Sequence, residues 1–476
     1  MSTSTESLER VRNAGLMERY HISLTELGFD TCVVAPATYS SSHPAVSLDR
    51  STVLRALKRV VLAHPALFVQ HGGKHDKKPY FTRLPQVDLN DVLTYATDLT
   101  ASIEEIVNAE LQKPFSRSTT KPLWRVTVRT DNVVVFAWHH SIGDGGCAQS
   151  FHAAFLTALN TKSGAEETDE STVVAAPDKL VIAPAIEERT NISVSFKTAC
   201  GTLYGSFAPL AFQPLRKAWT ANPISKEPHL QIETRIRMID PNTSRELVAL
   251  CREKKSTLTG FMHTLALFVL SHHLAVLEKE TPGKKQKYKT FSTVVPISLR
   301  RFTGTSPLDL CDQVTIYHTF PKITRDIPQF PPTKETFPWQ TASDYATSLH
   351  ANFKKSCEVI GTINFIYRLG ISKSYFLDHL GQKRETTLVL SNIGAMPKLK
   401  DLGEKQRDDG ALWQFDNVGF GQNDNVISSA IKLNMAGSPS GAISAVYNWG
   451  QNNIDTGLVE AVIADIHNSI STILAE

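Results

Sequence analysis

The sequence predicts a mixed α/β protein with two lobes, and three observations indicate this fold class. The chain has 476 residues, which is more than one hydrophobic core normally holds. Apolar patterns typical of strands and of helices occur in both halves of the chain. Between the halves the periodicity weakens, and the stretch "TKSGAEETDESTVVAAPDK" is polar, acidic and typical of a linker. We therefore expect an N-terminal lobe over residues 1–165, a linker or crossover over 166–229 and a C-terminal lobe over 230–476.

The first lobe begins with elements that apolar spacing and turn residues predict. In chain order they are an amphipathic helix over about residues 8–20, a strand over 31–39, a helix capped by Asp49 and ended by Pro65, an exposed hairpin at "KHDKKPYFTRL", and two strands around a tight turn at 130–132. The last of these strands, Val133–Trp138, is apolar on both faces, which predicts a central position in its sheet. A glycine-containing loop follows it, and helical spacing resumes at Cys147.

The second lobe also alternates between strand and helix patterns. Strands are expected in "LQIETRIRMI", "KTFSTVVPISLRR", "DQVTIYHTF", "ETTLVLSNIG" and "AISAVYNW", and helices in "PNTSRELVALCREKK", at 258–277 and at the C-terminus. The window 258–277 is long enough to reach across a membrane, but His263, His272 and His273 interrupt it. We interpret it as a buried helix and expect no transmembrane segment.

Composition excludes several classes of function. Hydrophobic residues make up 41% of the chain and charged residues 20%, as in ordinary globular proteins, and the formal net charge of +3 argues against nucleic acid as a partner. The six cysteines are scattered without a CxxC pair, and "MSTSTESLER" has no apolar secretory segment, so a reduced, cytoplasmic protein is expected. Peripheral membrane association through the 8–20 helix stays open, although its apolar face is modest and packing on the lobe is favoured.

The segment "WHHSIGDGG", residues 138–146, places two histidines, an aspartate and three glycines directly after the central strand. Side chains alternate along a strand, so His139 and His140 should point to opposite faces. They could not then share one metal ion, and no third ligand is recognisable by spacing, so no metal is expected.

This polar cluster has two interpretations. In the structural one, the histidines form hydrogen bonds in the core and Asp144 caps the following helix. In the catalytic one, the end of a buried strand presents reactive side chains, and a neutral imidazole accepts a proton near pH 7.

The segment "HHSIGDG" resembles the HHxxxDG motif of the CoA-dependent acyltransferase superfamily, which includes chloramphenicol acetyltransferase, and it matches at every defined position. Six segments, in the family's order, resemble the fungal alcohol O-acetyltransferase family more specifically: "ERYHISLTELGFDTCVVAPATYS", "WHHSIGDGGCAQSFH", "STLTGFMHTL", "FSTVVPISLRR", "LSNIGAMP" and "FGQNDNV". The resemblance covers most of the chain. It implies two chloramphenicol-acetyltransferase-like lobes, each a mixed sheet flanked by helices, with an active-site tunnel between them.

The resemblance implies an O-acyltransferase that moves an acetyl group from acetyl-CoA to a hydroxyl acceptor, for which a secondary-metabolite alcohol fits the family best. His140 would act as the general base for direct attack, without an acyl-enzyme. Asp144 would support the loop by pairing with an arginine, with Arg300 as the first candidate and Arg301 as the second. Gly145 would allow close approach of the substrate or satisfy the turn.

Further residues are candidates for binding acetyl-CoA or supporting the site. By resemblance, Ser391 in "SNIG" is an oxyanion donor or a contact to the pantetheine arm, although a turn that closes a strand is as good an interpretation. Lys284 and Lys285 could meet the CoA phosphates or be solvated surface. His139 is expected to be a packed, supporting histidine. No dinucleotide fingerprint or P-loop occurs, so acetyl-CoA would be a co-substrate, with no tightly bound cofactor and a monomeric chain.

Three alternative functions stay open. The chain could be an amide-forming, condensation-type acyltransferase, although no carrier domain is recognisable. It could be a catalytically silent ligand-binding relative. It could also transfer the acyl group to water, which would be detected as thiol release from acetyl-CoA alone.

Overall fold

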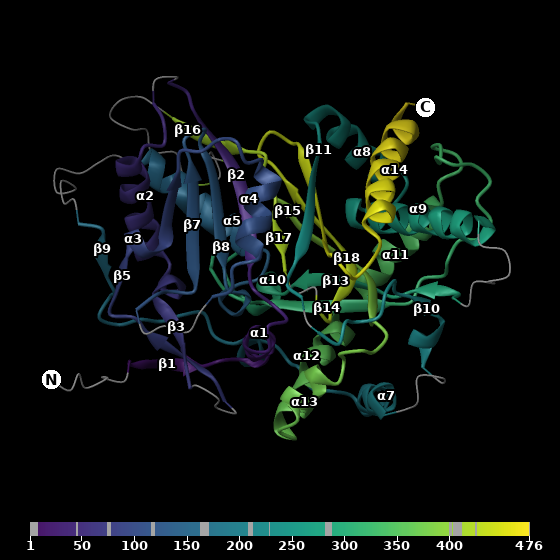
Figure 1. Ribbon diagram of the computed structural model, residues 1–476, viewed down its shortest axis with the longest axis horizontal. Helices are drawn as coiled ribbons and strands as arrows, with labels where there is room; N and C mark the ends of the chain where they lie inside the picture. The colour runs from purple at the N-terminus through teal and green to yellow at the C-terminus, as the bar shows by residue number, and fades with distance from the viewer. Residues whose placement is uncertain are drawn as a thin grey trace.

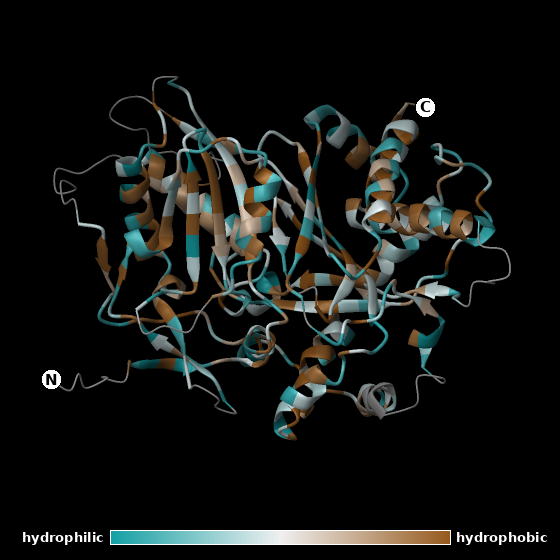
Figure 2. Ribbon diagram, in the orientation of Figure 1, coloured by the Kyte–Doolittle hydropathy of each residue, from teal (hydrophilic) through white to brown (hydrophobic). Residues whose placement is uncertain are grey.

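The computed structural model describes residues 8–43, 46–73, 78–115, 120–161, 171–207, 213–227, 229–280, 288–398, 402, 412–423 and 426–475. These residues form two lobes that lie side by side, each built on a six-stranded sheet with helices packed against it (Figure 1). Apolar residues gather on the central strands and on the helix faces turned toward them (Figure 2). The predicted two-lobed mixed α/β fold is therefore confirmed.

The N-terminal sheet contains β2 (Val33–Ser41), β6 (Leu93–Ala96), β7 (Trp124–Arg129), β8 (Val133–Trp138), β16 (Trp413–Asp416) and β17 (Gly421–Gln422). Five strands follow the order β16-β2-β8-β7-β6, and β17 also pairs with β2. As predicted, β8 is central and buried throughout. Phe136 and Trp138 share a core with α2 (Arg50–Ala63) and α5 (Cys147–Asn160). Val135 and Ala137 face the other way and pack with α4 (Ile103–Leu111).

The C-terminal sheet contains β11 (Ile232–Ile239), β13 (Thr293–Ser298), β14 (Val314–Thr319), β15 (Thr386–Ala395), β18 (Ser429–Gly437) and β19 (Ile443–Gly450). Its order is β11-β19-β18-β15-β13-β14, in which β15 runs parallel to both of its neighbours and the other pairs are antiparallel. The helices on this lobe are α8 (Pro241–Glu253), α9 (Leu258–Glu280), α11 (Trp339–Ala351) and α14 (Thr456–Leu474).

The predicted buried helix at 258–277 is α9. By length and composition it is the one helix in the described ranges that could cross a membrane, but 72% of its most apolar window is buried inside the protein. It packs against α11 and α14.

Shorter elements complete the described chain. They are β1 (Arg10–Asn13), α1 (Leu16–Glu26), β3 (Val69–Gly72), β4 (Tyr80–Arg83), β5 (Gln86–Asp88), α3 (Leu89–Val92), β9 (Val173–Ala175), α6 (Ile186–Arg189), α7 (Phe196–Phe207), β10 (Ala218–Trp219), β12 (Thr290–Phe291), α10 (Arg300–Thr303), α12 (Phe353–Arg368) and α13 (Ser372–Leu377).

The N-terminal segment differs from the expected helix over residues 8–20. Its first part is the strand β1, which pairs with β4, and α1 begins only at Leu16. The backbone N–H of Gly15 donates to Glu18 Oε2 at 2.6 Å, which closes the first turn of α1. The expectation was wrong because the pairing with β4, a non-local contact, keeps Arg10–Asn13 extended. The apolar side of α1 is buried in the protein, with Ile22 and Leu24 almost fully covered.

One segment crosses between the lobes. Residues 413–422, which the expected boundaries assign to the C-terminal lobe, supply β16 and β17 to the N-terminal sheet. Gln149 of α5 also donates to the carbonyl oxygens of Ile393 and Ala395 in β15, at 3.0 and 2.9 Å. These contacts hold the two lobes together around the end of β8.

Candidate active site

The polar motif lies where β8 meets the boundary between the lobes. After Trp138 the chain forms a short 3-10 helix over His140–Ile142, and the Trp138 indole N–H donates to the Gly143 carbonyl at 2.8 Å. A cavity of about 1630 Å³ opens in front of this turn. His140 and Asp144 line it from the N-terminal lobe, and residues of β13 and β15 line it from the C-terminal lobe. The motif therefore faces a large space between the lobes.

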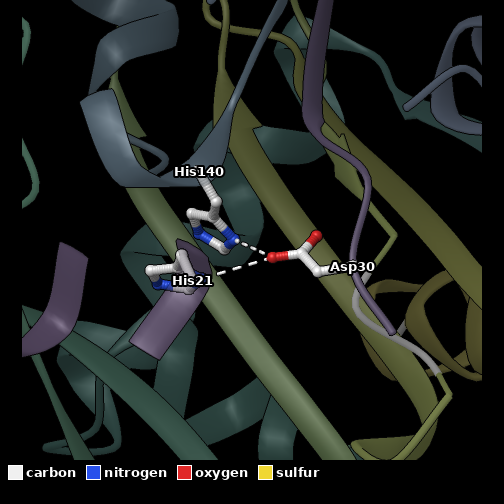
Figure 3. A group of neighbouring side chains, drawn as sticks. All are labelled: His21, Asp30 and His140. Carbon is white, nitrogen blue, oxygen red and sulfur yellow. Dashed lines mark hydrogen bonds and ion pairs between the residues drawn. The ribbon is translucent and has the colours of Figure 1, made fainter. Parts of the chain in front are cut away.

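His140 is held by two residues that precede it by a long way in the sequence. Its ring stacks on that of His21 in α1, with centroids 3.7 Å apart and an interplanar angle of 27°. Asp30, just before β2, places Oδ2 3.3 Å from His21 Nδ1 and 3.6 Å from His140 Nδ1 (Figure 3). The carboxylate thus lies beside the stacked imidazoles and faces the Nδ1 atom of each, while 8% of His140 is exposed and contributes to the cavity wall.

Asp30 is ionised in this environment. Its side chain is fully buried, which by itself raises the pKa of the carboxyl group. The two histidines beside it outweigh that effect and hold the pKa of Asp30 well below its usual range. An ionised carboxylate can only accept hydrogen bonds, so an imidazole nitrogen bonded to it must carry the proton.

Asp312 lies on the other side of His21, and its pKa is shifted in the opposite direction from that of Asp30. Its Oδ2 is 3.7 Å from His21 Nε2, which is too far for a hydrogen bond. Burial, reinforced by the charge of Asp144, raises the pKa of the Asp312 carboxyl group well above its ordinary value. Burial and the ion-pair distance to His21 thus act on this pKa in opposite directions, and burial dominates.

The neighbouring His139 points elsewhere, as the alternation argument predicts. Its Nδ1 accepts the backbone N–H of Ser141 at 3.0 Å, and its ring meets the edge of His71 with centroids 4.6 Å apart. Burial lowers the pKa of His139 well below its ordinary value and that of His71 to about 3. Both rings are therefore neutral at neutral pH, and His139 is placed as a packed residue.

Asp144 is paired with Arg300, the first of the two arginines expected. Arg300 Nη1 lies 2.6 and 2.7 Å from the two carboxylate oxygens, and both side chains are buried. Asp144 also accepts the backbone N–H groups of Gly146 and Gln313, at 2.8 and 3.0 Å. Burial alone would lower the pKa of the Arg300 guanidinium. The charge of Asp144 raises this pKa by more than burial lowers it, so the guanidinium stays charged. The arginine-pairing interpretation of Asp144 therefore applies, and the pair ties the motif to the C-terminal lobe. The N-cap residue of α5 is Gly146, whose own N–H Asp144 accepts, so Asp144 is not the cap of that helix.

The glycines of the motif have a packing reason that the sequence did not show. A Cβ on Gly146 would lie 2.5 Å from Arg300 Nη1, and one on Gly145 would lie 3.0 Å from Ile393 Cγ2 and 3.1 Å from Phe420 Cε2. The backbone of Gly146 is helical, at φ −64°, so the turn itself does not require glycine there. Gly145 also lines the cavity. Both positions are small because groups of the C-terminal half approach them closely.

Of the remaining candidate residues, the structure describes Ser391 but not the two lysines. Ser391 lies within β15, not in a turn, and lines the cavity. Its hydroxyl makes no hydrogen bond to another residue that the structure describes, so it is available to a ligand. Lys284 and Lys285 lie outside the described residues.

His21, Asp30 and His140 are also the one group in the described ranges that could hold a metal ion, because their ligand atoms lie within 4.8 Å of one another. Two imidazoles and a carboxylate suit zinc. In the present arrangement, however, Asp30 faces both Nδ1 atoms, so protons on the rings satisfy it without an ion. The expectation that no metal is needed stays a prediction.

Sequence reasoning missed His21 and Asp30. Both lie in a segment quoted for its family resemblance, but one is on a helix and the other precedes a strand, far from His140 in the sequence. Their proximity follows from the packing of α1 against the 3-10 helix of the motif, which no local spacing reveals.

Comparison with known proteins identifies relatives over most of the chain. A family model for alcohol acetyltransferases matches residues 13–455. "Probable alcohol acetyltransferase FCK4" of Fusarium pseudograminearum is 24% identical over 485 residues, covering 96% of this chain and 94% of the relative. "Probable alcohol acetyltransferase crmB" of Aspergillus fumigatus is 22% identical over 479 residues, covering 94% of this chain and 96% of the relative.

Two solved structures share the fold at low identity. TRI3 trichothecene 15-O-acetyltransferase from Fusarium sporotrichioides superposes with a TM-score of 0.72 at 12% identity, covering 97% of this chain and 94% of that one. The condensation domain of the monacolin K polyketide synthase MokA gives a TM-score of 0.58 at 12% identity, covering 99% and 98% of the two chains. At such identity these likenesses show the fold alone.

Proposed function

The chain belongs to the alcohol acetyltransferase family and is an acyltransferase, and on that premise we propose that it acetylates the hydroxyl of a bulky, largely apolar alcohol from acetyl-CoA, with His140 as general base. The observation that carries the proposal is the position of His140. Its imidazole lies on the wall of the cavity between the lobes, and its Nδ1 is buried and turned toward an ionised carboxylate. The tautomer that carries its proton on Nδ1 presents the Nε2 lone pair as the acceptor for the substrate's proton.

The proposed reaction moves one proton and one acyl group. His140 Nε2 accepts the hydroxyl proton as the alcohol oxygen attacks the thioester carbonyl carbon of acetyl-CoA. The tetrahedral intermediate carries a negative oxygen, which needs a nearby donor, and the free hydroxyl of Ser391 on the same cavity wall is our candidate. When the carbon–sulfur bond breaks, the His140 imidazolium returns its proton to the CoA sulfur. The ester and the free thiol leave, and the base is regenerated.

The size and lining of the cavity support a large acceptor. A pocket for one drug-sized ligand measures about 300–1,000 Å³. The cavity of about 1630 Å³ is large enough for more than one such molecule, as a two-substrate reaction requires. Its α1 and α12 side is apolar, with Met17, Ile360 and Ile363 in one cluster. We infer a secondary-metabolite alcohol larger than a short-chain one.

The test is thiol release and ester formation with acetyl-CoA and a panel of alcohols and amines graded in size. Positioned general bases contribute about 10²–10⁴-fold, so His140→Asn should lose turnover by that order. His139→Asn, a matched change at the adjacent position, should retain most of it, because the Asn oxygen can accept the Ser141 N–H as His139 Nδ1 does. Equal turnover in wild type and His140→Asn would contradict the proposal. Release without any acceptor would indicate hydrolysis instead.

A cytoplasmic location is part of the same proposal. All six cysteines are free thiols, and five of them are buried, which fits a reducing compartment. Fractionation of cells that express the full chain tests this directly.

A further inference from the structure

We infer that Asp30 and His21 form, with His140, a three-residue unit in which Asp30 orients and strengthens the base and His21 moderates it. This inference rests on the proposed function. It assigns two positioning residues, neither of which belongs to the HHxxxDG motif.

The first argument is orientation. Asp30 Oδ2 lies 3.6 Å from His140 Nδ1, and that nitrogen is buried from solvent. A carboxylate at this position favours the tautomer with the proton on Nδ1, and this tautomer leaves a lone pair on Nε2. Catalytic hydrogen bonds are often long in unliganded enzymes and shorten when substrate binds. Asp30 would therefore keep the base in the form that can accept a proton from the cavity side.

The second argument is charge. When His140 accepts the hydroxyl proton it becomes an imidazolium in a buried site, where an uncompensated cation is costly. The ionised Asp30 lies beside that cation and stabilises it without itself taking a proton. Asp30 Oδ1 has no hydrogen-bond partner among the described residues, so the negative charge is directed to the two histidines.

The third argument concerns His21, which competes for the same oxygen. His21 Nδ1 lies 3.3 Å from Asp30 Oδ2, closer than His140 Nδ1 does. A hydrogen bond from His21 draws charge from the carboxylate, and any positive charge on the stacked His21 ring repels an imidazolium 3.7 Å away. His21 therefore makes His140 less basic than Asp30 alone would. Such a base still releases its proton readily to the departing thiolate.

The other ionisable groups around His140 do not reproduce this pattern. Asp144 is balanced by Arg300, and burial raises the pKa of Asp312 well above its ordinary value. His139 and His71 are held neutral by burial. Glu18, on α1, is paired with Arg12. Asp30 is thus the carboxylate whose oxygen lies within ion-pair distance of His140 Nδ1 in the described part of the chain.

The test is the pH dependence of kcat/KM for the full chain with acetyl-CoA and the alcohol that the panel identifies. Turnover needs neutral His140, so activity falls on the acid side with a midpoint at the pKa of this group. Asp30→Asn removes the charge at nearly constant size and should lower both the plateau rate, by on the order of 10²-fold or more, and the acid midpoint, by about one pH unit. Asp30→Glu keeps the charge and should restore part of the rate.

His21→Phe is the opposing variant. Phenylalanine keeps the stacked ring but cannot hydrogen-bond to Asp30, so the acid midpoint should move to higher pH, by up to about one unit. A merely structural role predicts lower yield or melting temperature for both variants but no shift of the midpoint in either. Nitrogen-15 chemical shifts of labelled histidines provide a second readout, in which Asp30→Asn should change the tautomer of His140.

The outcomes separate the two proposals. If Asp30→Asn and His21→Phe both keep the wild-type midpoint and tautomer, the three-residue unit is overturned while the acetyl transfer stands. If His140→Asn keeps full turnover, the proposed base is wrong, whatever the other variants do. A metal analysis of the purified chain is included, because a stoichiometric zinc ion lost in Asp30→Asn would replace the proton-based role with a metal site and would also overturn the inference.

Discussion

At the scale of single residues, Asp144 shows how a charged group can be buried without penalty. The carboxylate receives Arg300 and two backbone N–H groups, so every direction open to it carries a donor. Arg300 also donates to the Cys311 carbonyl at 2.9 Å. This hydrogen bond connects the Asp144–Arg300 pair to the loop before β14. A buried ion pair of this kind contributes little to stability by itself. Removing one partner, however, leaves the other charge buried and uncompensated, which is strongly destabilising.

We therefore predict that Asp144→Asn and Arg300→Met each lower the free energy of unfolding by about 3–5 kcal/mol. The double variant should lose less than the sum of the two, because the second change removes the charge that the first one left unpaired. Denaturant unfolding of the four proteins measures this cycle. Additive losses, within about 0.5 kcal/mol, would show that the two side chains act independently.

His140 and Asp144 could be predicted from the sequence because they occupy defined positions of the HHxxxDG motif. Arg300 could be predicted because the family resemblance implies an arginine partner for Asp144. The site residues His21 and Asp30 carry no such signal. A histidine on an amphipathic helix and an aspartate before a strand are ordinary in any protein, and they become meaningful only when the fold brings both to one imidazole.

At the scale of elements, α1 matters most because it carries His21. Its first turn is fixed by Glu18, which accepts the Gly15 N–H at 2.6 Å and two bonds from the Arg12 guanidinium, at 2.7 and 2.6 Å. Glu18 is almost fully buried, so water cannot easily replace these bonds. The position of His21 then depends on a carboxylate one turn earlier.

We predict that Glu18→Ala destabilises the start of α1 by about 1–2 kcal/mol and speeds hydrogen exchange of the amides in its first turn. Turnover should fall with it, because His21 loses its fixed place against Asp30. Glu188→Ala, an exposed acid in the first turn of α6, is the matched control and should change neither measurement. Unchanged exchange in Glu18→Ala would mean that packing and the bond from the Leu16 N–H to Glu187 Oε1 are enough to position α1.

The elements that sequence predicted well are those with local signals. Asp49 caps α2 by accepting the Thr52 N–H, and Asp240 and Asp455 cap α8 and α14 in the same way. The segment at residues 8–20 has a glycine at the cap position and an amphipathic pattern on both sides of it, so periodicity alone could not show that its first part pairs as a strand.

At the scale of the whole molecule, the two lobes are joined by chain crossing as well as by contact. The strands β16 and β17 come from the C-terminal half and extend the N-terminal sheet beside β2. Such an exchange cannot be read from composition, because an apolar segment such as residues 413–422 carries no local signal of which sheet it joins. Sequence therefore predicts two lobes and where the HHxxxDG turn lies, but not which strands each sheet finally contains.

A second property of the whole molecule is that several histidines are buried and have lowered pKa values. Burial lowers the pKa of His71 and His263 to about 3 and that of His152 and His467 to about 4, and it lowers the pKa of His139 well below its ordinary value. In the unfolded chain these groups titrate near pH 6.5. Below that pH the unfolded state binds more protons than the folded state, so folding stability must fall as the pH falls.

We predict that the melting temperature is highest between roughly pH 6.5 and 9 and declines steadily from pH 6.5 to 4.5, with each histidine contributing up to about 1.4 kcal/mol per pH unit. Three groups oppose the trend and favour the folded state at low pH. Burial raises the pKa of Asp312 and of Glu187, and the partner Glu385 outweighs burial and raises the pKa of His379. They are outnumbered by the five histidines.

Asp30 does not affect stability between pH 4.5 and 6.5, because a carboxyl group whose pKa is lowered costs stability only below about pH 4. On the alkaline side, burial raises the pKa of the Cys32 and Cys251 thiols to about 12, so stability should decline again above about pH 9.

Differential scanning fluorimetry across pH 4.5–9.5 at constant ionic strength checks the curve. His152→Gln should make the decline on the acid side less steep by the contribution of one histidine. A melting temperature that is constant between pH 7 and 5 would show that these histidines reach water before the chain unfolds.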